Sequence, residues 1–151
     1  MIRVQAEDFD VGLELKKLTN ESKSIGGVNC FVGLVRDFAG GKSVKSMTLE
    51  HYPAMTKRAL LEIEAEALNR WSLSNTLIIH RYGRLDPGDQ IVLVAVASAH
   101  RKATIEATQF LIDWLKTKAP FWKLEETPDG RQWVSALSSD EVAANRWVKE
   151  K

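Results

Sequence analysis

Hydrophobic positions along this chain follow two periods, one typical of strands and one typical of helices. An uninterrupted apolar run over 91–97 predicts a buried strand. After a short polar step, apolar residues recur at the three-and-four spacing of one helix face, at Ala103, Ala107, Phe110, Leu111 and Trp114. Pro120 disfavours helical geometry in the residue before it, so this helix is expected to end near Lys118.

The rest of the chain predicts strands and helices in alternation, without a linker or a repeat. Strands are expected at 2–5, 28–36, 44–52, 76–80 and 131–135, and helices at 11–18, at 53–71 with Leu60, Ile63 and Ala67 inward, and over the tail 139–151 with Ser139 or Asp140 as N-cap. Turn-forming clusters at 86–89 and 127–130 separate neighbouring strands. This pattern favours an α+β fold, with a mixed, largely antiparallel sheet and packed helices in a single domain, 1–151.

The second face of the 103–118 helix is less ordinary than its core face. Ile105, Ile112 and Lys116 fall together there, which predicts a covered surface. Residues 99–123 carry five basic side chains against two acidic ones, a local charge of +3 in a chain of net charge +1. The helix N-terminus adds partial positive charge beside Arg101, so the stretch is expected to receive an anion. Taken singly, the lysines near the helix end could serve only as capping charges, and Lys123 could snorkel from an aromatic cluster.

Composition narrows the class of protein. A hydrophobic content of 44% and a near-zero net charge suit a soluble globular domain and disfavour a general nucleic-acid binder. The chain shows no membrane-spanning run and no signal-peptide core, so a cytoplasmic protein is expected. Its single cysteine, Cys30, lies in an apolar strand pattern and is expected to be a buried structural thiol. The three histidines lack metal-ligand spacing, and no metal site is predicted.

A glycine-rich segment imitates a nucleotide-binding loop. Gly40-Gly41-Lys42-Ser43 matches the end of a P-loop, but Arg36 stands where that loop needs its first glycine, and a strand rather than a helix follows. A flexible turn is the simpler interpretation, with a mobile lid beside Arg36 as the alternative.

Several runs together resemble one known family, the large, catalytic subunit of molybdopterin synthase. They are Phe31-Val-Gly-Leu-Val-Arg36, Leu49-Glu-His-Tyr-Pro-Ala-Met55, Ile79-His-Arg-Tyr-Gly83, Pro87-Gly-Asp89, Ser98-Ala-His-Arg101 and Leu115-Lys-Thr-Lys-Ala-Pro-Phe-Trp-Lys123. The resemblance extends from about Gly26 to Trp147, whereas residues 1–25 match weakly. It implies an α/β hammerhead-like fold.

The resemblance also implies a reaction and partners. A small ubiquitin-like subunit with a C-terminal Gly-Gly thiocarboxylate supplies sulfur to cyclic pyranopterin monophosphate, forming the dithiolene of molybdopterin without a further cofactor. The complex is a heterotetramer around a central homodimer. The lack of a plausible catalytic cysteine agrees with imported sulfur, and both reactants are anions that basic side chains would bind.

Family substrate-binding positions fall on residues from four segments. Lys116 is expected to stabilise charge on the thiocarboxylate carbon's oxygen, Lys123 and Arg36 to hold the pterin and its phosphate, and His100 to be able to carry a proton. Lys116 and Lys123 are the expected catalytic residues, and Phe31 and Ile112 are expected to line the pocket. The substrate-binding set is Leu34, Val35, Arg36, His100, Arg101, Lys116, Lys123, Leu124 and Glu125.

Helix length adds a constraint on this set. Arg101 and Lys116 are about 22 Å apart along a straight helix, so one small pterin cannot touch both. His100 and Arg101 of one protomer are therefore expected to serve Lys116 and Lys123 of another. Two other classes stay open: a non-catalytic phosphate- or nucleotide-binding module, and an RNA binder. The RNA binder needs aromatic residues exposed on a sheet face, whereas here they are expected to gather around Trp114, Phe121 and Trp122.

Overall fold

The computed structural model describes residues 1–135 and 138–148, which form helices packed on two four-stranded sheets. The helices are α1 (Val11–Asn20), α2 (Pro53–Arg70), α3 (Arg101–Thr117) and α4 (Ser138–Asn145). The strands are β1 (Ile2–Gln5), β2 (Gly27–Leu34), β3 (Phe38–Ala39), β4 (Lys42–Ser43), β5 (Ser46–His51), β6 (Asn75–Arg81), β7 (Gly83–Leu85), β8 (Gln90–Ser98), β9 (Phe121–Thr127) and β10 (Gly130–Val134). The predicted α+β class is confirmed.

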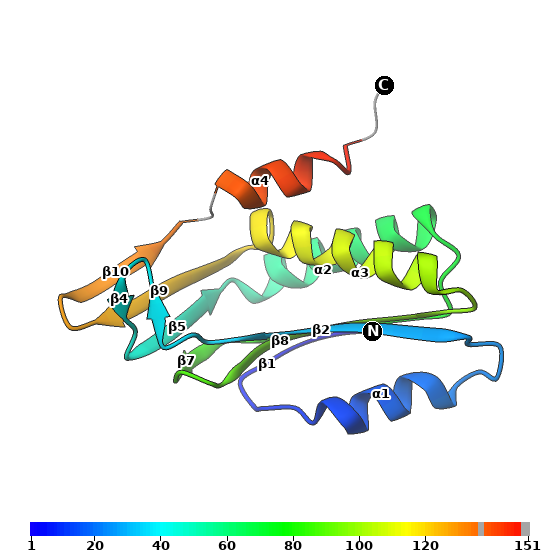
Figure 1. Ribbon diagram of the computed structural model, residues 1–151, viewed down its shortest axis with the longest axis horizontal. Coiled ribbons are helices and arrows are strands. Elements are labelled where there is room, and N and C mark those ends of the chain that lie inside the picture. The colour runs from blue at the N-terminus through cyan, green and yellow to red at the C-terminus, as the bar shows by residue number, and fades with distance from the viewer. Residues whose placement is uncertain (136–137, 149–151) are drawn as a thin grey trace.

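The first sheet, in the order β1-β6-β8-β2, is covered by helices on both faces. Only β1 and β6 run parallel; the other neighbours are antiparallel, as the mixed pattern predicted. Figure 1 shows α1 on one face and α2 and α3 on the other. Because β8 is buried on both faces, its sequence is continuously apolar rather than alternating. The inward faces predicted for α2 and α3 are confirmed: Leu60, Ile63, Ala67, Ala107, Phe110 and Leu111 are buried.

The second sheet, in the order β10-β9-β5-β7, is antiparallel throughout and lies beside one end of the first (Figure 1). The strand predictions lacked β7 and β9. Beneath the sheet is a small core of Val35, Leu49 and Leu85. The expectation that aromatic residues avoid an exposed sheet face is wrong, because Trp122 and Trp133 lie 42% and 56% exposed on the outer face.

The glycine-rich segment forms a tight hairpin rather than a loose turn or a phosphate loop. Ala39 pairs with Lys42 across Gly40 and Gly41, whose φ angles are 57° and 79°. Two successive residues with positive φ characterise the turn that suits two-residue hairpins, and glycine adopts them without steric cost. The motif is thus explained by backbone geometry.

The prediction of a buried Cys30 is wrong, since its side chain is exposed. Cys30 lies opposite Ala95 on β2, the edge strand of the first sheet, on the same face as Val28 and Val32. Those two valines are only partly buried against the core under α1. This helix packs mainly on β6 and β8 rather than on β2. An apolar strand pattern therefore does not bury every inward-facing residue when the strand is at an edge.

The C-terminal tail forms α4, which begins one residue before the predicted start. Ser139 and Asp140 therefore lie in its first turn rather than at its N-cap. Past the helix, Arg146 and Trp147 donate hydrogen bonds to one oxygen of the buried Asp113 on α3, at 2.6 and 2.7 Å. Residues 149–151 of the predicted tail lie outside the described part. No helix among the described residues has the length and apolar character needed to cross a membrane.

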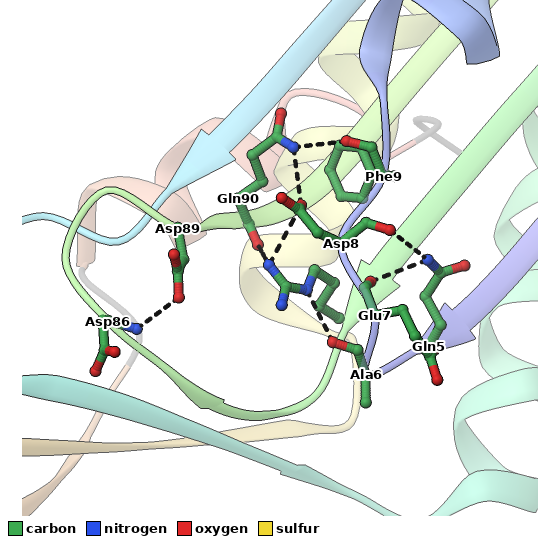
Figure 2. A network of polar contacts seen from close by, with 9 residues as sticks. Gln5, Ala6, Glu7, Asp8, Phe9, Asp86, Asp89 and Gln90 are labelled. Atoms are coloured by element: carbon green, nitrogen blue, oxygen red, sulfur yellow. Dashed lines mark hydrogen bonds and ion pairs between the residues drawn. The ribbon is translucent and has the colours of Figure 1, made fainter.

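A polar network ties the segment between β1 and α1 to the first sheet. Figure 2 shows the Gln90 amide donating hydrogen bonds to the Asp8 carboxylate and the Phe9 carbonyl, at 2.9 and 2.7 Å. Arg81, at the end of β6, donates to the Ala6 and Gln90 carbonyl oxygens, both at 3.0 Å. The end of β6 is consequently fixed from two sides.

Candidate active site

A cavity of about 290 Å³ lies where the two sheets and the C-terminal end of α3 meet. Its apolar wall comes from both sheets and from α3, and includes the predicted lining residues Phe31 and Ile112. Its titratable groups come from five segments: Arg36, His80, Lys116, Lys123, Glu125 and Asp140. A cavity of this size, with an apolar wall and a few polar groups, suits a small ligand.

Three basic residues from distant parts of the sequence line this one cavity. Arg36 is two residues past the end of β2, whose register with β8 shifts between Gly33 and Leu34. Lys116 is in the last turn of α3, and Lys123 is on β9 beyond Pro120. Pro120 ends the helical stretch and turns the chain back, so both lysines face the same space.

The electrostatic environment of Lys123 is unusual for a lysine. Burial lowers its pKa to about 8, and the positive charge of Lys116 contributes in the same direction. The carboxylates of Asp140 and Glu125 act in the opposite direction. Because the ammonium form is the one penalised, Lys123 can exchange its proton near neutral pH, and an incoming anion would favour its charged form.

Alternation along β9 explains which residues of that strand reach the cavity. Phe121, Lys123 and Glu125 line the cavity, with Glu125 buried. Leu124 is on the opposite face, paired with Trp133 of β10 and Thr48 of β5. Leu124 was predicted to bind substrate with Lys123 and Glu125, but it faces away from the cavity that these two residues line.

Residues 34 and 35 also point to different places. Leu34 lines the cavity and is exposed, whereas Val35 is only 3% exposed within the small core of the second sheet. The Val35 N–H donates to the Asp89 carbonyl at 2.9 Å, and its carbonyl accepts from the Gly88 N–H at 2.8 Å. Val35 thus holds the 86–89 turn against the strand that presents Arg36.

His100 and Arg101 are at the other end of α3 from the cavity. His100 is the N-cap residue, Arg101 begins the helix, and both are exposed. Neither lines the cavity within this chain, as the helix length of about 22 Å requires. Ile105, on the same helix, is 54% exposed, so no part of the described chain covers the predicted second surface near that end.

Two titratable cavity residues were missing from the sequence prediction. His80 is inside a run that carried the family resemblance, but its burial among apolar residues gave no functional signal. Asp140 was considered only as a helix cap, because nothing in the sequence places α4 beside β9. Both depend on tertiary contacts between segments far apart in the chain.

The fold and the cavity define a class: an α+β protein with a small-ligand cavity lined by three basic residues and two carboxylates. The MoaE protein family model matches residues 4–118, beginning ahead of the motifs that start near Gly26. The chain is 53% identical over 146 residues to the molybdopterin synthase catalytic subunit of Pseudomonas aeruginosa, covering 97% of each. It therefore belongs to the MoaE family of molybdopterin synthase catalytic subunits.

Solved structures agree with this assignment. A molybdopterin biosynthesis MoaE protein from Burkholderia ambifaria superposes with a TM-score of 0.85 at 49% identity, covering 99% of each chain. A chain from the complex of subunits 1 and 2 of the Helicobacter pylori molybdopterin-converting factor superposes with a TM-score of 0.74 at 21% identity, covering 89% of this chain and 90% of that one. The second likeness extends to the fold alone.

Proposed function

We propose that this chain transfers sulfur from the thiocarboxylated C-terminus of a small ubiquitin-like subunit to cyclic pyranopterin monophosphate, forming the molybdopterin dithiolene. The observation that carries the proposal is the convergence of Arg36, Lys116 and Lys123 on one cavity. Both reactants are anions, and the names of the relatives identify the same synthase. The reaction is placed in the cytoplasm, where an exposed thiol such as Cys30 stays reduced.

Each sulfur transfer must satisfy a simple atom balance. The thiocarboxylate sulfur forms a C–S bond to a side-chain carbon of the cyclic pterin while a C–O bond at that carbon breaks. The oxygen leaves as a phosphate ester oxygen in one transfer and, after protonation, as water in the other, and the product is a thioester between the pterin and the tail. Water then adds to the thioester carbonyl, and the tail leaves as a carboxylate while the sulfur stays on the pterin. Negative charge develops on the carbonyl oxygen in this second step, so a fixed cation beside it accelerates the reaction.

The three cations are assigned separate roles. Lys116, which keeps much of its surface exposed at the end of α3, is assigned to the thioester carbonyl oxygen. Arg36 and Lys123 are assigned to the phosphate and the pterin, with the guanidinium able to offer two parallel hydrogen bonds. Because its pKa is lowered to about 8, Lys123 can also pass a proton during the transfer.

The catalytic unit is proposed to be a homodimer with a small subunit at each end. His100 and Arg101 of one protomer complete the anion site of the other, since α3 holds them away from their own cavity. Ile105 is then covered in the dimer. The relatives are named catalytic subunits, which supports a heteromeric assembly.

Reconstitution with a thiocarboxylated small subunit and the cyclic pterin tests the catalytic assignment. Lys116→Ala is expected to lower the rate of molybdopterin formation at least about 100-fold, as loss of an oxyanion-stabilising group does. Lys118→Ala is the matched control, because Lys118 is two residues away, exposed and outside the cavity-lining set. Equal loss in both variants, or normal turnover of Lys116→Ala, contradicts the assignment. Pterin binding by the wild type without conversion would instead indicate the non-catalytic binding module.

Mixing two inactive variants tests the shared site. Lys116→Ala and Arg101→Ala are each expected to be inactive as pure dimers. In a hybrid dimer, one site carries both changes and the other carries neither. Random mixing of subunits should therefore restore about a quarter of the wild-type activity. If the mixture stays as inactive as its components, His100 and Arg101 do not act across the dimer.

A further inference from the structure

His80 is a buried titratable residue of the cavity, and the proposed reaction assigns it no role. It is in β6, only 6% exposed, and its ring lines the same cavity as Lys116 and Lys123. The ring stacks on Phe121 of β9, with centroids 3.6 Å apart and an angle of 11° between the planes. Contacts from both sheets thus fix the plane of the imidazole.

The backbone fixes which ring nitrogen carries the proton. His80 Nδ1 is 2.8 Å from the Arg81 carbonyl oxygen, and a carbonyl can only accept, so Nδ1 is the donor. Further hydrogen bonds hold the same stretch, because the Arg81 side chain donates to the carbonyl oxygens of Ala6 and Gln90. In the neutral ring, Nε2 is therefore the nitrogen with an available lone pair.

The ring stays neutral throughout the working pH range. Burial, assisted by the positive charges of Lys123 and Lys116, lowers the His80 pKa to about 3, although the bond to the Arg81 carbonyl acts in the opposite direction. A group with this pKa neither adds charge to an anion site nor carries protons near neutral pH. What it offers to a ligand is a fixed hydrogen-bond acceptor.

The cavity needs such an acceptor if it holds a pterin. In their charged forms, Arg36, Lys116 and Lys123 offer hydrogen-bond donors but no acceptors. Such donors suit the phosphate and the thiocarboxylate. A pterin ring system presents N–H and NH₂ donors, which the three cations cannot pair with, and each buried donor left unpaired lowers the affinity. Glu125, Asp140, Thr117 and Ser135 also line the cavity and carry acceptor oxygens, but His80 differs from them because a stacked ring and a hydrogen bond to the backbone fix its orientation.

We propose that His80 Nε2 accepts a hydrogen bond from an N–H group of the pterin, so that His80 selects the heterocycle while the cations select its phosphate. This inference rests on the proposed function, because it takes the cyclic pterin as the ligand. The role is one of binding and specificity rather than proton transfer.

Two amide substitutions separate the two nitrogens of His80. His80→Asn places an amide near the Nδ1 position, where it can still donate to the Arg81 carbonyl, but it supplies no acceptor at the Nε2 position. His80→Gln reaches the Nε2 position with its amide oxygen. In direct titrations with cyclic pyranopterin monophosphate, His80→Asn should bind about tenfold more weakly than wild type, and His80→Gln within about threefold of it.

Inorganic phosphate and the small subunit are the control ligands. Affinity for both should be unchanged in each variant, because the cations that bind anions remain in place. Equal pterin affinity in wild type and a folded His80→Asn, or an equal loss of phosphate affinity, overturns the proposal. If the wild-type protein fails to bind the cyclic pterin, the proposed function is contradicted instead. If the wild type converts the pterin and His80→Asn binds it equally well, only this inference is contradicted.

Discussion

The two sheets of this protein differ in what they bury. The first sheet and its helices enclose an apolar core, with Ile78, Val94 and Leu111 fully inaccessible. The second sheet has a small apolar core of three residues and lines a cavity that contains a buried Glu125 and a half-buried Lys123. Apolar burial stabilises a fold, whereas buried charges reduce stability unless a partner compensates for them. Stability and binding are therefore assigned to different ends of the molecule.

The largest difference between the two regions is expected when a core side chain of the first region is shortened, because this lowers the free energy of unfolding. Leu111→Ala is expected to lower the free energy of unfolding by about 2–5 kcal/mol, because α3 packs this side chain against the sheet without access to solvent. Leu61→Ala, on the exposed face of α2, should change it by less than about 0.5 kcal/mol. Denaturant unfolding provides both values. Loss of pterin affinity per folded molecule in Leu111→Ala would show that the regions are not separable.

A smaller effect is expected where the tail joins the first region. Asp113 accepts from Gln109 at 2.8 Å as well as from Arg146 and Trp147. Asp113→Asn removes the charge of a buried acceptor, so the unfolding free energy should fall by about 1–3 kcal/mol. Glu62→Gln is the control, because its pair with Arg58 is exposed and should contribute less than about 0.5 kcal/mol. Equal losses in chemical denaturation would mean that Asp113 does not anchor the tail.

The first region was largely predictable from the sequence because each of its elements has a periodic pattern. The 91–97 run and the Ala107, Phe110 and Leu111 stripe depend on local repeats that a helix or strand must satisfy to bury apolar surface. Cys30 was misjudged because the pattern does not indicate which strand ends at the edge of a sheet. That information lies in pairing between distant segments.

The second region was less predictable for the same reason. β7 has only three residues, and β9 places the charged Lys123 and Glu125 on the face that lines the cavity, so neither strand shows a clear apolar alternation. Arg36, Lys116 and Lys123 could be grouped through family resemblance, but the composition of a segment does not show that Leu124 faces away from them. His80 and Asp140 join the site only when β6, β9 and α4 come together.

The pH dependence of activity is expected to distinguish the two regions, because Lys123 of the second region should titrate near pH 8. With the Lys123 pKa lowered to about 8, the charged form, to which we assign pterin binding, is lost as pH rises through this value. The ratio kcat/KM should fall about tenfold per pH unit well above it. Lys123→Arg should move this decline upward, since a guanidinium stays protonated, whereas Lys118→Arg should leave it in place. An unchanged profile in Lys123→Arg would assign the decline to another group.

Stability should respond to the same group with the opposite sign. Between about 8 and the ordinary lysine value of 10.5, the unfolded chain binds more protons at this position than the folded chain. The contribution of Lys123 to stability therefore rises with pH over this window, while activity falls. Thermal unfolding of wild type and Lys123→Met at pH 7.5 and 9.5 measures it. The wild type should gain relative to the variant on going to the higher pH, and a relative loss would contradict the lowered pKa.

The smallest effect is expected at Cys30, where the first region meets solvent. Cys30→Ser should change the unfolding free energy by less than about 0.5 kcal/mol, because the thiol is already exposed on an edge strand. Molybdopterin formation should be unchanged, since the sulfur comes from the small subunit and Cys30 is outside the cavity-lining set. A thiol reagent should modify the folded wild type as readily as the unfolded chain. If the folded monomer protects Cys30 from the reagent and the unfolded chain does not, Cys30 is not exposed at the edge of the sheet. If only the dimer protects it, β2 lies at the interface between protomers.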